Sequence, residues 1–105
     1  FPGGFLPSVT AILDSVTCSS DLRIYQLEDI GLHYAETLNK WRESFRTNLG
    51  LIENMGFDNE FIRMWEYYFC YCEGGFLEQV ISDVQILFVK PNCRRNSLVS
   101  EFYNL

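Results

Sequence analysis

Basic side chains and histidine are scarce in this sequence of 105 residues. His33 is the single histidine, and eight lysines and arginines stand against fourteen acidic residues, for a formal charge of -6 and a pI near 4.6. A protein that binds nucleic acid draws much of its affinity from lysine and arginine contacts to phosphates. The charge balance therefore argues against a nucleic-acid partner.

Motifs of common enzymes and metal sites are also missing. The sequence contains no G-x-S-x-G or H-E-x-x-H motif and no glycine-rich phosphate loop between a strand and a helix. Cys70 and Cys72 lie two residues apart in a predicted helix, so they face nearly opposite directions and cannot share a metal ion. We expect no metal and four reduced thiols, at Cys18, Cys70, Cys72 and Cys93.

Long apolar runs are absent, and the remaining composition is that of a globular protein. No run approaches the roughly 18 apolar residues that a bilayer-spanning helix needs, and no basic-then-apolar leader opens the sequence. Hydrophobic residues make up 48%, which predicts one modest core. The sequence begins with Phe1-Pro2-Gly3-Gly4 rather than methionine, and we expect it to be part of a longer protein.

Hydrophobic spacing predicts the order helix, strand, long helix, helix, strand. The expected ranges are a helix over 7–16, a turn over 18–21, a strand over 22–27, helices over 30–55 and 59–80, and a strand over 84–90. Asp29 and Asp58 are predicted helix N-caps, while Gly74-Gly75 is expected to weaken or shorten the second long helix. A two-stranded sheet is marginal in water, so we expect these strands to complete a larger sheet or to self-associate.

Several short motifs occur together along the chain. They are Phe1-Pro2-Gly3-Gly4, Glu28-Asp29-Ile30-Gly31-x-His33-Tyr34, Gly56-Phe57-Asp58, Phe61-x-Arg63-Met64-Trp65-Glu66-Tyr67-Tyr68, and Cys72-Glu73-x-Gly75-Phe76. In this order and spacing the sequence resembles the C-terminal part of the cyclopropane-fatty-acyl-phospholipid synthases, which are similar to the mycolic acid cyclopropane synthases. The resemblance covers residues 1–91, and residues 92–105 are predicted to form a polar tail.

The resemblance implies an α/β fold, namely the C-terminal portion of a class I, Rossmann-like methyltransferase that uses S-adenosylmethionine. The family transfers a methyl or methylene group to a cis double bond of a phospholipid acyl chain, through a carbocation that bound bicarbonate deprotonates. By resemblance the parent protein is an enzyme with S-adenosylmethionine and bicarbonate as cofactors. The segment alone is expected to be inactive, because the cofactor-binding residues of such folds lie upstream.

Tyr34 is the catalytic candidate by resemblance. The family's Gly-x-x-Tyr-x-x-Thr-Leu pattern matches Gly31, Tyr34, Thr37 and Leu38, which implies that Tyr34 is the tyrosine that holds bicarbonate. Spacing alone favours an ordinary core tyrosine, because Tyr34 opens an apolar helix face. His33 is expected to point off that face and to be a surface or supporting group.

The acyl pocket and the membrane contact follow from the same resemblance. Candidates for lining the pocket are Phe5, Leu6, Trp65, Tyr68 and Phe69, and an ordinary core role remains open for each. The basic cluster of Lys90, Arg94 and Arg95 is either a contact for anionic head groups or part of a solvated tail. The expected partners are phospholipid acyl chains and, for the parent, a second copy, with a cytoplasmic location at the inner face of the membrane. The alternative function is a non-catalytic lipid-binding or protein-interaction module.

The first testable prediction concerns the cofactor. We expect the 105-residue chain to bind S-adenosylmethionine no better than background, because it has no glycine-rich turn at a helix N-terminus. Isothermal titration calorimetry measures this directly, and micromolar binding would contradict it.

Overall fold

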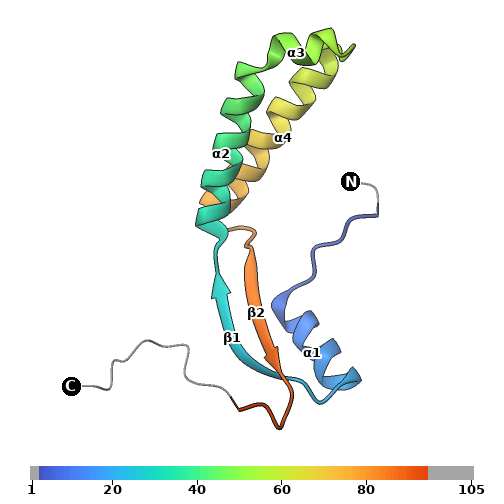
Figure 1. Cartoon of the computed structure of the whole chain (residues 1–105), viewed down its shortest axis with the longest axis vertical. Helices are drawn as coiled ribbons and strands as arrows, with labels where there is room; N and C mark the ends of the chain where they lie inside the picture. The colour runs from blue at the N-terminus through green and yellow to red at the C-terminus, as the bar shows by residue number, and fades with distance from the viewer. Residues whose placement is uncertain (1–2, 95–105) are drawn as a thin grey trace, which may run out of the picture. The chain divides into compact units, whose positions relative to one another are not determined.

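The computed structural model describes residues 3–94 (Figure 1). The elements in chain order are α1 (Val9–Ser19), β1 (Arg23–Asp29), α2 (Gly31–Thr47), α3 (Leu49–Asn54), α4 (Asn59–Leu77) and β2 (Val84–Val89). The chain forms two compact units, one of residues 1–26 with 86–105 and one of residues 27–85. The predicted alternation of helices and strands is confirmed, except that the long helix is divided in two.

The second unit is a helical hairpin in which α2 and α4 lie side by side and α3 joins them at one end (Figure 1). Its core forms where the apolar stripes of α2 and α4 meet. Ala35 and Leu38 of α2 are 1% and 2% exposed, and they pack with Phe69 and Phe76 of α4. The small Ala35 lets the two helices approach closely, while the larger side chains fill the space beside it.

The predicted helix over 30–55 is wrong in one respect, because the helix is interrupted at Asn48. The backbone of Asn48 leaves the helical region, with φ -105° and ψ 16°. Its side-chain amide donates to the carbonyl oxygen of Ser44 at 2.7 Å, while its backbone N–H is shared between the carbonyls of Ser44 and Phe45. Asparagine competes with helical bonding in this way, so α2 ends and α3 begins.

Nearby residues determine where α4 begins and where it ends. Asp58 is its N-cap as predicted, and its carboxylate accepts from the N–H of Phe61 at 2.9 Å. Gly74 and Gly75 lie within the helix, which ends at Leu77 rather than at residue 80. Gln79 then takes a left-handed φ of 57°, and the N–H groups of Val80 and Ile81 return to the carbonyl of Gly75. A Cβ on Gly75 would lie 3.2 Å from Ile81, so glycine lets this turn fold back onto the helix.

The two strands form one antiparallel sheet (Figure 1). At one end the N–H of Ile30 donates to the carbonyl of Asp83 at 2.8 Å, and at the other the Arg23 guanidinium donates to the carbonyl of Pro91 at 3.0 Å. β1 ends at Asp29, two residues later than predicted, whereas β2 agrees with the prediction to within one residue. Pro91 follows β2 and cannot extend the ladder.

In the first unit, α1 begins and ends later than predicted. Pro7 precedes the helix, and Ser8 is the N-cap, because its hydroxyl accepts from the N–H of Ala11 at 3.1 Å. The predicted turn over 18–21 is partly helical, since Ser19 donates its hydroxyl proton to the carbonyl of Ser15 and holds the last turn.

The remaining expectations concern membranes and the tail. Among residues 3–94, no helix combines the length and apolar character that crossing a bilayer requires. Lys90 and Arg94 are exposed, while Arg95 and the rest of the predicted tail lie outside the described residues.

A capping prediction follows for α4. Replacing Asp58 with alanine leaves the N–H of Phe61 without its acceptor, so the helical hairpin should lose about 1 kcal/mol of unfolding free energy. Asp58→Asn keeps a capping acceptor and should be nearly neutral. Urea unfolding followed by far-ultraviolet circular dichroism measures both. Equal losses in the two variants would show that the cap does not stabilise α4.

Candidate functional site

The start of α2 places Tyr34 on the face that meets α4. The predicted N-cap at Asp29 is wrong by one residue, because the N-cap by backbone position is Ile30. The Asp29 carboxylate still accepts from the N–H of Gly31 at 2.9 Å and so satisfies one donor of the first turn. A Cβ on Gly31 would lie 3.1 Å from that carboxylate, so glycine favours this close approach. The N–H of Tyr34 then donates to the carbonyl of Ile30 at 3.0 Å, which completes the turn.

Tyr34 is half-buried between aromatic rings of both helices. Its ring meets Phe76 of α4 edge-on at 4.8 Å and Trp41 of α2 edge-on at 6.0 Å. No hydrogen bond of the Tyr34 hydroxyl occurs within residues 3–94. The ring is therefore fixed by packing, while the hydroxyl remains available as a donor.

A second tyrosine, Tyr68 of α4, lies in the same interface and is hydrogen-bonded to Cys72 one turn later. Burial raises the pKa of the Tyr68 phenol above its ordinary value, and the neighbouring Cys72 thiol and then Tyr34 raise it further. Tyr68 therefore stays a neutral phenol at physiological pH. Cys72, interpreted from the sequence as a packing residue, also takes part in this polar contact.

The five predicted pocket residues divide between the two units. In the hairpin, the Trp65 ring lies 5.3 Å from Tyr68 and 5.7 Å from Phe69, and all three pack on the core with Tyr34. Phe69 itself is 8% exposed and is a core side chain. Phe5 and Leu6 belong to the first unit, where each is 81% exposed. The structure thus places three of the five on the hairpin core against which Tyr34 also packs.

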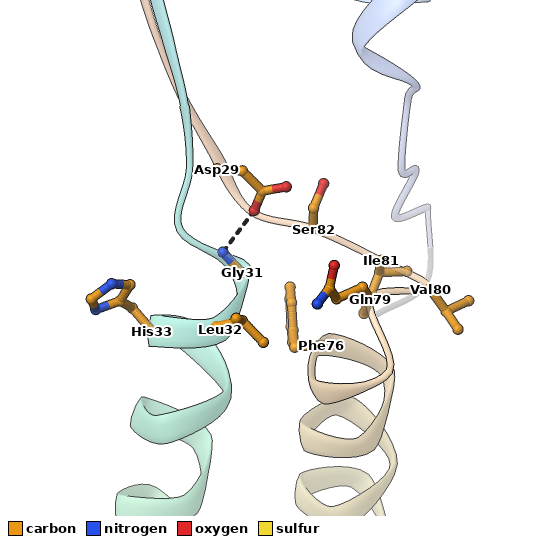
Figure 2. Close-up of a pocket in the computed structure, with 9 residues that line it drawn as sticks. All are labelled: Asp29, Gly31, Leu32, His33, Phe76, Gln79, Val80, Ile81 and Ser82. Atoms are coloured by element: carbon orange, nitrogen blue, oxygen red, sulfur yellow. Dashed lines mark hydrogen bonds between the residues drawn. The ribbon is translucent and has the colours of Figure 1, made fainter.

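A pocket of about 470 Å³ opens beside the start of α2 (Figure 2). Leu32 and Phe76 lie between α2 and the loop that follows α4, and Ser82 and Gln79 add polar groups from that loop. His33 is exposed at the rim and is turned away from the other labelled side chains, in keeping with a surface role. Because Phe76 also contacts Tyr34, this pocket adjoins the part of the α2–α4 interface that contains Tyr34.

Polar contacts that sequence reasoning missed hold α2 against α4. Arg42 forms an ion pair with the Glu73 carboxylate at 3.1 Å and donates to the Cys70 sulfur at 2.9 Å, while the Asn39 amide donates to Glu73 at 3.1 Å. The Cys70 contact, with the charge of Glu73, raises the pKa of the Arg42 guanidinium, so it remains a cation. The sequence signal for these contacts was that Asn39 and Arg42 lie three residues apart, on one face of α2.

This geometry supports binding of an apolar chain beside a phenol donor. In the part of the chain that the structure describes, the aromatic rings that meet Tyr34 are those of Trp41 and Phe76. Within residues 3–94, no cluster of histidine, cysteine and acidic groups could hold a metal ion.

Known proteins share sequence with this chain. A family model described as mycolic acid cyclopropane synthetase matches residues 1–86. The tuberculostearic acid methyltransferase UfaA1 of Mycobacterium tuberculosis is 47% identical over 76 residues, which are 72% of this chain and 18% of that protein. A probable fatty acid methyltransferase of Pseudomonas putida is 34% identical over 91 residues, which are 87% of this chain and 23% of that protein. The chain thus spans about a fifth of the length of these relatives.

The raised pKa of Tyr68 has a measurable consequence. Because the folded pKa lies above the unfolded one, its contribution to stability is complete below about pH 10 and is lost as pH rises through the folded value. Tyr68→Phe should remove phenolate absorbance that develops above the ordinary tyrosine pKa, and Cys72→Ala should shift that absorbance to lower pH. Tyr71→Phe, at an exposed position of α4, is the control and should leave this absorbance in place. Loss of this absorbance in Tyr71→Phe but not in Tyr68→Phe would refute the assignment of the raised pKa to Tyr68.

Proposed function

The chain belongs to the mycolic acid cyclopropane synthetase family, and we propose that it forms the part of a lipid methyltransferase that supplies Tyr34 to the reaction centre. The complete protein would transfer a methyl group from S-adenosylmethionine to a cis double bond of an acyl chain. The match over residues 1–86 carries this proposal, because it includes Tyr34 together with Gly31 and Leu38 in the first two turns of α2.

The surroundings of Tyr34 support its role as an anion-holding donor. A neutral phenol donates one hydrogen bond without adding charge, so it orients a small anion without neutralising its basicity. Tyr34 fits this requirement, because its ring is held between Phe76 and Trp41 and its hydroxyl is not used by other described residues. Bicarbonate, when bound, supplies the base that removes a proton from the carbocation formed by methyl transfer.

The aromatic side chains around Tyr34 support an acyl substrate. Trp65, Tyr68 and Phe76 present apolar rings on the same hairpin, and an acyl chain gains free energy when such surfaces exclude water from it. Tyr68 stays neutral and bonded to Cys72, so it adds no charge near a reacting carbon. On this proposal α4 forms one wall of the acyl site.

The nature of the product is part of the proposal. The two relatives are named as methyltransferases that act on fatty acids. We therefore place addition of a methyl group first, with closure of a cyclopropane ring on a phospholipid chain as the alternative outcome of the same carbocation. The residues that hold S-adenosylmethionine would lie in the portion of the relatives that this chain does not span, and work at a membrane surface remains part of the proposal.

The decisive variant is Tyr34→Phe in the complete protein. It removes one hydroxyl and leaves the ring contacts in place. A hydrogen bond to a charged group is worth about 1.5–3 kcal/mol, so kcat should fall roughly ten- to a hundredfold while affinity for S-adenosylmethionine is unchanged. Added bicarbonate should restore part of the lost rate.

The matched control is Tyr71→Phe, which removes a hydroxyl from the exposed side of α4. Its kcat should equal that of the wild type across the same bicarbonate series. A wild-type rate for Tyr34→Phe at low bicarbonate would return Tyr34 to an ordinary packing role. An absence of methyl transfer by the wild-type protein to any acyl lipid would instead favour the lipid-binding module.

A further inference from the structure

A row of polar contacts joins α2 to α4. The bonded pairs, taken in order along α2, are Asn39 with Glu73, Arg42 with Cys70, and Arg46 with Glu66. Arg42 also forms an ion pair with Glu73, so one carboxylate of α4 is held by two side chains of α2. Hydrogen bonds depend on direction as well as distance, so the row links the helices in a way that apolar packing does not.

The spacing of this row fits two helices that run in opposite directions. Its residues on α2 are three and then four positions apart, and their partners on α4 step back along the chain by three and then four positions. Residues at such spacings lie on one face of a helix. The two polar faces therefore match at every step in the register that the structure has.

A shift of three residues, about one helical turn, breaks this match in either direction. In one direction, Arg46 would leave Glu66 and lie opposite Arg63, which carries a like charge. In the other direction, Asn39 would lie opposite Phe76, whose ring offers its amide no ordinary acceptor. The row therefore favours one register of α2 on α4 over its neighbours.

Glu73 is the least exposed of the four charged residues in the row. Its side chain is 14% exposed and that of Arg42 is 21% exposed, whereas the values for Glu66 and Arg46 are 36% and 53%. Exposed ion pairs contribute little, because water and salt screen them. A carboxylate mostly withdrawn from water depends on its partners, and a pair of this kind acts chiefly against wrong alignments. Glu73 is thus the member with most influence on the register.

The row also anchors the side chains that hold Tyr34. Phe76 lies one turn after Glu73 on α4, and Trp41 immediately precedes Arg42 on α2. The rings of Phe76 and Trp41 meet the Tyr34 ring at 4.8 and 6.0 Å. Because each residue of an α-helix adds about 1.5 Å along the axis, even a slide of one residue would displace Phe76 from its contact with Tyr34.

We propose that Glu73 is a positioning residue for the reaction, because it fixes α4 against α2 in the register that places the Tyr34 hydroxyl. The inference rests on the role that the proposed function gives to Tyr34. In this role Glu73 does not need to touch the acyl chain or the anion. It acts through its bonds to Asn39 and Arg42, and through the Phe76 ring that packs on Tyr34.

Fluorine NMR of the complete protein tests the positioning. With a ring-fluorinated tyrosine at position 34, the fluorine resonance should shift or split in Glu73→Gln, which keeps the size of the side chain but removes its charge. Glu36→Gln is the matched control, because it breaks the ion pair that Glu36 forms with Lys40 within α2 at 3.0 Å, and it should leave the resonance in place. An unchanged resonance in Glu73→Gln, or the same change in both variants, would overturn the proposal.

A double-mutant cycle on turnover provides the second measurement. A misplacement of about 1 Å can cost about a hundredfold in rate, so Glu73→Gln should lower kcat about tenfold. This loss should nearly vanish in the Tyr34→Phe background, because the hydroxyl that Glu73 positions is then absent. An equal loss in both backgrounds would overturn the proposal. A wild-type rate for Tyr34→Phe would instead refute the proposed function, and a shifted fluorine resonance in Glu73→Gln would still support the positioning of Tyr34 by Glu73.

Discussion

The packing of α2 against α4 is the interaction on which the rest of the hairpin depends. Leu38 is 2% exposed, and burying a leucine side chain contributes about 1.5–3 kcal/mol. Its neighbour Ala35 keeps the helices close, while Phe69 and Phe76 fill the space from the other side. Tyr34 and Tyr68 lie on different helices, so they share one aromatic face only because this contact is made.

Polar contacts set the alignment of the same two helices. Glu73 of α4 accepts from Asn39 and forms an ion pair with Arg42, which lies one turn away from Asn39 on α2. Apolar packing alone tolerates small slides of one helix along the other, whereas a carboxylate held by an amide and a guanidinium favours one alignment. The distance of 4.8 Å between the rings of Tyr34 and Phe76 is a result of that alignment.

The strand pair has a different character from the hairpin. β1 is exposed along its whole length, and β2 is mostly half-buried. A two-stranded sheet gains little stability in water, so contact of these strands with further strands or helices is favoured. The chain spans about a fifth of the length of its relatives.

The sequence by itself determined the order of the elements, the cap at Asp58 and the end of β2, because each depends on side chains within a few residues. The family was also recognisable from motifs in order along the chain. The division of the long helix at Asn48 could not be predicted from hydrophobic spacing, since the apolar stripe continues past Asn48. The helix ends there because the side-chain amide of Asn48 donates a hydrogen bond to the carbonyl of Ser44.

Only the tertiary structure decided which candidate site residues meet. It packed Tyr34, Trp65 and Tyr68 against one core, placed Tyr68 beside Cys72 and made Phe69 a core side chain, while Phe5 and Leu6 fell in the other unit. Sequence spacing shows which residues share a face of one helix. Which face meets another helix, and at what height, depends on contacts between residues about thirty positions apart, such as Arg42 with Glu73. Those contacts form only when the hairpin closes, so the local pattern does not contain them.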